Sequence, residues 1–147
     1  MTLSASDFWD FSLKVYPDWQ QTLLLLQDDY DLNINLLLFC LYLEQRNQRL
    51  SAQQMATLMQ NCEQTRPLLM SLREVRRAAK GVNQQAYSQL KQAELELEKQ
   101  QQQALIRAAN SMQFSEVQGK GNLQSYVELK QLTDSEALQK LLNKLVY

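Results

Sequence analysis

Acidic and amide side chains are concentrated between residues 27 and 35, where two strongly apolar segments meet. Gln27 and Asp28 end the first apolar segment, and Asn35 begins the second. Carboxylate and amide groups at such a junction can bind a cation or a polar ligand, or they can form hydrogen bonds between the ends of two helices. We therefore treat Gln27, Asp28 and Asn35 as a candidate polar corner, and we expect Asp28 and Asn35 to form hydrogen bonds across it.

The same segment resembles the first half of a calcium-binding loop, but the second half does not follow. The sixth position, where the loop needs Gly, is Ile34, and the twelfth, where it needs Glu, is Cys40. A magnesium–diphosphate site would need a second acid-rich helix, and Glu94, Glu96 and Glu98 are spread around theirs. The sequence therefore predicts no metal site, no cofactor and no catalytic residue.

Basic side chains form a second candidate site. Arg73, Arg77 and Lys80 share one face of a predicted helix. Such a stripe can bind a phosphate or the acidic surface of another protein. It can equally be a solvated face, or it can pair with acids of the same chain such as Asp28 or Glu74.

Composition excludes several classes of chemistry. The chain of 147 residues has no His, which removes Ser-His-Asp and Cys-His catalysis and metal sites built on imidazole. With 15 basic and 16 acidic residues, a globally basic nucleic-acid-binding protein is not expected. The apolar run from Leu36 to Leu43 is much shorter than the ~20 residues that span a bilayer. Cys40 and Cys62 lie in apolar patterns and indicate buried thiols in a cytoplasmic protein.

Hydrophobic periodicity predicts an all-α fold, with residues 1–147 forming a single-domain helical bundle of six or seven helices. Only three Gly and two Pro interrupt the chain. The helices are expected near residues 7–16, 17–29, 34–45, 51–80 with an interruption, 83–112, 123–132 and from 133 onward, with a loop at 114–121. Capping boxes are predicted at Ser51 and Thr133.

Two prolines determine where helices are expected to break. Pro17 is suited to the first turn of a second helix, where its missing N–H has no cost. Pro67 predicts either a kink or two abutting helices. The helix at 34–45 should be the buried centre, because it has almost no polar face. The long helix near 83–112 has a polar middle, so it should project from the body or lie on its surface.

Four short motifs occur in a fixed order along the chain. They are Trp9-Asp10-Phe11, Leu26-Gln27-Asp28, Asn35 to Phe39, and an arginine-rich stretch ending at Arg76-Arg77. This order resembles a proteobacterial family known only as a domain of unknown function, and the resemblance spans about Phe8 to Leu105. It implies a soluble bacterial protein in the cytoplasm, and it implies no activity, cofactor or catalytic residue.

Two classes of function fit these observations. The favoured one is a non-catalytic helical interaction module, an adaptor or regulator, that contacts an acidic surface of another protein or pairs as a homodimer through its long helix. The alternative is a small-ligand or anion-binding protein, or an enzyme, built from Gln27, Asp28 and Asn35 with an arginine of the basic stripe. The two differ in whether Asp28 and Asn35 line an open pocket or cap helices in a closed core.

Overall fold

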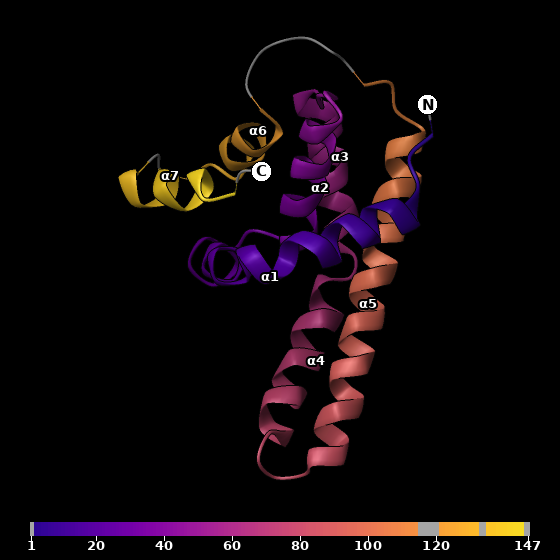
Figure 1. Ribbon diagram of the computed structural model, residues 1–147, viewed down its shortest axis with the longest axis vertical. Helices are drawn as coiled ribbons and strands as arrows, with labels where there is room; N and C mark the ends of the chain where they lie inside the picture. The colour runs from indigo at the N-terminus through magenta and orange to yellow at the C-terminus, as the bar shows by residue number, and fades with distance from the viewer. Residues whose placement is uncertain (1, 115–120, 133–134, 146–147) are drawn as a thin grey trace.

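The computed structural model of the protein describes residues 2–114, 121–132 and 135–145. Within these residues it has seven α-helices and no β-strand (Figure 1). The helices are α1 (Ala5–Tyr30), α2 (Ile34–Gln45), α3 (Ala52–Glu63), α4 (Arg66–Ala79), α5 (Gln84–Asn110), α6 (Asn122–Leu129) and α7 (Glu136–Asn143). The predicted all-α class, the number of helices and the long helix are confirmed. None of the helices in the described part of the chain could cross a bilayer.

Side-chain caps begin several helices at the predicted residues. Asn33 accepts a hydrogen bond from the backbone N–H of Leu36 and so caps α2. Ser51 and Gln54 form the predicted capping box of α3, and Asn83 caps α5. Each cap satisfies a backbone donor that would otherwise be unpaired.

The start of α7 differs from the prediction. Its cap is Ser135, whose hydroxyl accepts a hydrogen bond from the N–H of Leu138. The predicted capping box began at Thr133, which lies outside the described residues, as does most of the predicted loop at 114–121.

The prediction that Pro17 begins a second helix is wrong. α1 continues through it, from Ala5 to Tyr30. Pro17 has no N–H to donate to the carbonyl of Leu13, and a proline inside a helix bends it. Figure 1 shows the two halves of α1 running in different directions. The helix tolerates this break because Pro17 is exposed, so that water can reach the freed carbonyl, and because Trp19 and Leu23 on the following turns are buried.

Pro67 separates two helices rather than kinking one. α3 ends at Glu63, α4 begins at Arg66, and Pro67 lies in the first turn of α4, where its missing N–H would be unpaired in any case. The other end of α4 is followed by Gly81 with φ +78°, a backbone conformation that glycine adopts readily. Both boundaries of α4 therefore follow from local backbone chemistry.

α2 is the central helix, as predicted. Every residue from Leu36 to Leu43 is at most 4% exposed. The ring of Phe8 lies 5.2 Å from the rings of both Phe39 and Tyr42, centroid to centroid. Helices α1, α3, α5 and α6 all contact α2. A helix enclosed in this way has to be apolar around most of its circumference, which explains its sequence.

α4 and the first half of α5 form a hairpin that extends away from the other helices (Figure 1). We call residues 66–97 the arm. Among its residues in α4, only Leu69 is buried. The second half of α5 enters the body, where Leu105, Ile106 and Ala109 join the core. The long helix thus projects at one end, as predicted. It packs on other helices of its own chain, and the homodimer through it stays a prediction.

Replacement of a core leucine tests the central position of α2. Leu41 is 1% exposed, so Leu41→Ala should lower the free energy of unfolding by about 2–5 kcal/mol, because it leaves a cavity in the core. Leu68→Ala on α4, where the side chain is 57% exposed, should change it by less than about 0.5 kcal/mol. Urea denaturation measures both, and equal effects would show that α2 is not the buried centre.

Candidate functional site

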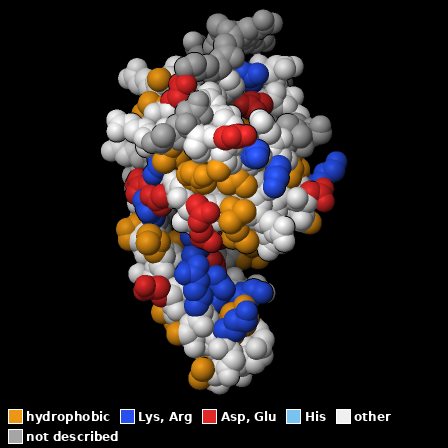
Figure 2. Space-filling view, turned by 90° about the vertical axis from the view of Figure 1, so that its left-hand side faces the viewer, with side chains coloured by type: hydrophobic (Ala, Val, Ile, Leu, Met, Phe, Trp, Pro, Cys, Tyr) orange, Lys and Arg blue, Asp and Glu red, His pale blue; other side chains and the backbone are white. Residues whose placement is uncertain are grey.

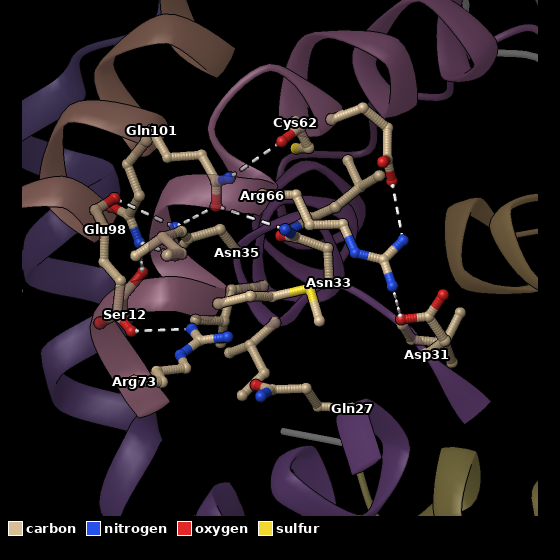
Figure 3. Close-up of a pocket in the computed structure, with 18 of the residues that line it drawn as sticks. Ser12, Gln27, Asp31, Asn33, Asn35, Cys62, Arg66, Arg73, Glu98 and Gln101 are labelled. Atoms are coloured by element: carbon tan, nitrogen blue, oxygen red, sulfur yellow. Dashed lines mark hydrogen bonds and ion pairs between the residues drawn. The ribbon is translucent and has the colours of Figure 1, made fainter. Parts of the chain in front are cut away.

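A cavity of about 890 Å³ opens between the root of the arm and the body, and we call it the cleft. Helices α1 to α6 all contribute to its walls. Its large apolar lining residues include Trp9, Leu13, Leu38, Met59, Met70 and Leu95. Figure 3 shows that polar side chains from α1, α2, α4 and α5 converge on the same space.

Both groups of residues singled out in the sequence reach this cleft. Gln27, Asp28 and Asn35 line it near the junction of α1 and α2, and Arg73 and Arg77 line it from α4. The fold therefore brings the polar corner and part of the basic stripe to one cavity, although α3 separates them in the sequence. Sequence reasoning proposed each group but had no means of placing them together.

Three buried amide side chains form the floor of the cleft, and we call Asn35, Gln101 and Gln102 the amide cluster. Asn35 Nδ2 donates to Gln101 Oε1 at 2.8 Å and to the backbone carbonyl of Glu98 at 3.0 Å. Asn35 Oδ1 accepts from Gln102 Nε2 at 3.0 Å. Each of the three residues is at most 7% exposed. Asn35 thus forms the expected structural hydrogen bonds, but its partners belong to α5 and not to the end of α1 (Figure 3).

Gln101 connects three parts of the fold. Its Nε2 donates to Thr65 Oγ1 at 2.6 Å and to the carbonyl of Cys62 at 3.4 Å, at the turn between α3 and α4. Its Oε1 also accepts from Asn33 Nδ2 at 3.4 Å. Because a backbone carbonyl can only accept a hydrogen bond, these contacts determine which way the amide of Gln101 points. Gln101 therefore holds α5 against α2 and the root of the arm.

Gln102 is less completely paired. Its Nε2 donates to Ser12 Oγ at 2.9 Å, and that hydroxyl donates to the carbonyl of Phe8. Its Oε1 has no hydrogen-bond partner among the described residues. Rotating the amide by half a turn would bring Oε1 against Asn35 Oδ1, two acceptors, so the observed orientation is the better one. An unpaired buried acceptor costs about 1–3 kcal/mol, which makes this the least satisfied part of the floor.

Sequence reasoning missed both glutamines, because a polar run of good helix formers looks like a solvated face. Gln101 and Gln102 are each 2% exposed, so this part of the polar middle neither projects from the body nor lies on its surface. The available signal was helical spacing. Leu105 and Ile106 lie four residues further on and therefore on the same faces of α5, and both are core residues.

Asp28 does not form the predicted hydrogen bond across the corner. It is exposed near the end of α1 and has no hydrogen-bond or ion-pair partner among the described residues. Asp31 makes the electrostatic contact instead, with Arg66 Nη2 at 2.5 Å and Lys130 Nζ at 3.4 Å. Asp31 directly follows α1, as its C-terminal cap in the left-handed conformation. The prediction for Asp28 is therefore wrong, and its carboxylate is free.

Part of the basic stripe is already neutralised by the chain itself. Arg73 donates from Nε to Glu94 at 2.8 Å and from Nη2 to Glu98 at 3.2 Å, and Arg76 Nε contacts Glu94 at 2.5 Å. These acids lie on α5, so the expectation that Asp28 or Glu74 would be the partners is wrong, although pairing within the chain was one of the alternatives considered. Arg73 is held at the root of the arm (Figure 3).

The rest of the stripe is free. Arg77 and Lys80 are exposed, and neither has an ion-pair partner in the described part of the chain. Arg77 lines the cleft, whereas Lys80 caps the C-terminal end of α4 and does not. The predicted set of Arg73, Arg77 and Lys80 therefore divides into one structural arginine and two available cations.

One thiol and two phenol groups on the cleft walls keep their protons at neutral pH. Burial raises the pKa of the Cys62 thiol to about 12, and it also raises the pKa of the Tyr16 and Tyr126 hydroxyls. A thiol or phenol in that state is a poor nucleophile at neutral pH. The described residues contain no cluster of acids and thiols suited to a metal ion. These three groups are therefore not activated nucleophiles.

Charge reversal should separate the structural arginine from the free one. Arg73→Glu places a third carboxylate beside Glu94 and Glu98, so it should lower the free energy of unfolding by about 1–3 kcal/mol. Arg77→Glu breaks no contact in the described residues and should change it by less than about 0.5 kcal/mol. Chemical denaturation of the two variants measures the difference, and an undisturbed Arg73→Glu protein contradicts a structural role for Arg73.

The pH dependence of stability should reveal the raised pKa of the Glu98 carboxyl group. Burial raises the pKa of its carboxyl group, even though Arg73 beside it acts in the opposite direction. The folded protein therefore keeps this proton at a pH where the unfolded chain has lost it, and stability falls as the pH rises through the raised pKa. Glu98→Gln cannot titrate, so it should become more stable relative to wild type as the pH rises through that range. A difference in unfolding free energy between Glu98→Gln and wild type that stays constant with pH contradicts a raised pKa at Glu98.

Comparison with known proteins gives one family and no activity. A family model described as protein of unknown function (DUF2390) matches residues 7–105, which include most of the cleft. Searches of curated proteins and of solved structures give no match. The matched region covers the motifs that carried the resemblance in the sequence, from the first aromatic motif to the arginine-rich stretch. This chain belongs to the DUF2390 family.

Proposed function

We propose that the protein is a non-catalytic interaction module, an adaptor or regulator of the bacterial cytoplasm, whose cleft receives a segment of another protein. The observation that supports this most directly is an open cleft with large apolar side chains on its walls and charged groups around it. The free, buried thiols of Cys40 and Cys62 agree with a reducing compartment.

Exposed hydrophobic side chains gather where the cleft opens. Leu13 is 54% exposed, Met70 52% and Leu95 45%, and all three line the cleft. Single exposed hydrophobic residues are common on protein surfaces, but several around one concavity are typical of a binding site. Two methionines, Met59 and Met70, add side chains that adapt easily to the shape of a partner.

A small-molecule ligand is the second candidate. A volume of about 890 Å³ lies within the range of pockets that hold small molecules, and Gln27, Asp28 and Asn35 line an open cleft, as this alternative requires. Against it, Asn35 is already hydrogen-bonded within the amide cluster. Asn35 is therefore not available to orient a small ligand, whereas a protein segment can use the apolar walls.

A photo-crosslinking amino acid placed at one of two matched positions tests the proposal. Leu13 lines the cleft, whereas Val75 is equally exposed, at 54%, but does not. In cells that make the protein naturally, the probe at Leu13 should give a discrete crosslinked product, and the probe at Val75 should not. Adding Met70→Glu should remove the product at Leu13, because it places a charge on the apolar wall.

Other outcomes of this experiment distinguish a protein segment from a small molecule as the occupant of the cleft. A product of twice the mass of the chain identifies a second copy as the partner. No product at Leu13, together with a small molecule that stays bound in native mass spectrometry and is lost in the Met70→Glu protein, favours the ligand-binding alternative. Equal crosslinking at Leu13 and Val75, or neither a product nor a bound molecule, contradicts the proposal.

A further inference from the structure

We infer that the occupant of the cleft is an amphipathic α-helix with acidic side chains on the flank that faces the arm and basic side chains on the flank that faces the end of α1. This inference rests on the proposed function and names the kind of segment that is bound. It follows from the backbone of the walls, from the size of the cleft and from the charges that the chain leaves unpaired.

The walls of the cleft favour a helical ligand over an extended one. Every wall is a helix or a helix end, and the described residues contain no sheet edge that could pair with an incoming strand. The amide cluster uses most of its groups on itself and on backbone carbonyls. An extended segment would therefore bury peptide groups without partners, whereas a helix satisfies its own backbone.

The dimensions agree with a short stretch of helix. A helix about 10 Å wide with a pitch of about 5.4 Å fills roughly 420 Å³ per turn. The cleft, at about 890 Å³, thus holds about two turns. Two turns present three or four apolar side chains on one face, and apolar walls that include Leu13, Met59 and Met70 can cover them.

The net unpaired charge of α4 and its C-terminal cap is positive, and that of the end of α1 is negative. Arg77, Lys80 and the acid Glu74 beside them have no ion-pair partner in the described residues, which leaves +1 from two cations and one anion. At the end of α1, Asp28 and Asp29 are exposed and without an ion-pair partner in the described residues, which gives −2. Of these, Arg77, Glu74 and Asp28 line the cleft itself.

The basic side chains of the arm are visible on the surface. Figure 2 shows basic side chains gathered in one patch on the arm, directly below hydrophobic and acidic side chains of the body. Charges of this kind at the rim of an interface add modest affinity, but they select partners and set their orientation. A helix with one acidic and one basic flank complements both sides at once, and its binding should weaken as salt screens the rim.

Four synthetic helical peptides of about 15 residues, with one apolar face in common, test the inference by fluorescence anisotropy. Their two flanks carry acid and base, acid and acid, base and base, or glutamine only. Wild-type protein should bind the acid–base peptide most tightly, by about three- to tenfold over the others at low salt.

Reversal of each rim charge should change this order in a defined way. In Arg77→Glu both sides of the cleft are acidic, so the base–base peptide should bind best. In Asp28→Lys the two free charges at the end of α1 cancel, so the acid–acid peptide should bind as tightly as the acid–base peptide. Lys14→Glu and Asp18→Lys are matched reversals at exposed positions of α1 that do not line the cleft, and they should leave the wild-type order unchanged. Circular dichroism confirms that each variant is folded.

The results separate this inference from the proposed function. If no peptide binds, the helical ligand is wrong, and a crosslinked product at Leu13 would still support an interaction module with another kind of segment. If all four peptides bind with equal affinity, or if the controls change the order as much as the rim variants do, the charge selectivity is wrong. If the peptides bind as expected in vitro but Leu13 gives no product in cells, the cleft has this selectivity and the proposed cellular role fails.

Discussion

Three buried amide side chains determine how α5 lies against α2. Asn35, Gln101 and Gln102 hydrogen-bond to one another and to backbone carbonyls, and a buried amide that loses such partners costs about 1–3 kcal/mol per group. A shift of α5 by one residue would rotate its side chains by about 100° and break the whole cluster. Apolar contacts alone distinguish the correct register of α5 from a shifted one less sharply, because hydrophobic burial has no directional requirement. The same register places Glu98 beside Arg73, so the position of the arm depends on it.

Two prolines give the cleft its shape by opposite effects. Pro17 lies within α1 and bends it, so that the first half crosses the body and the second half runs toward the corner with α2 (Figure 1). Pro67 lies in the first turn of α4, so a new helix starts there. The second half of α1 bears Asp28 and α4 bears Arg77, so the courses of these two helices bring both residues to one cavity. The site therefore depends on two residues that have no polar side chain.

Much of the fold was predictable because it follows from local chemistry. The caps at Asn33, Ser51 and Asn83 and the apolar run of α2 act within one or two helical turns, and the sequence displays them directly. Pro17 was misjudged because helix continuation at a proline is decided by tertiary packing on both sides of it. The roles of Gln101, of the free Asp28 and of the paired Arg73 were hidden for the same reason, since each depends on a partner on a distant helix.

The polar groups of the cleft divide into a floor that is almost fully satisfied and a rim that is not. The floor contributes to stability and specifies the fold. The exposed side chains at the rim, which also include apolar ones, gain little stabilisation from contacts within the folded chain; they are Leu13, Met70, Arg77 and Asp28. Folding the arm down onto α1 would bury the apolar ones, but it would require a bend in α5, which is one continuous helix from Gln84 to Asn110 that runs from the arm into the body. Arg73 ties α4 to this helix through Glu94 and Glu98. The cleft is thus open before any occupant arrives. A preorganised site of this kind loses little affinity to rearrangement, which is the physical reason to regard the rim as the surface that selects a partner.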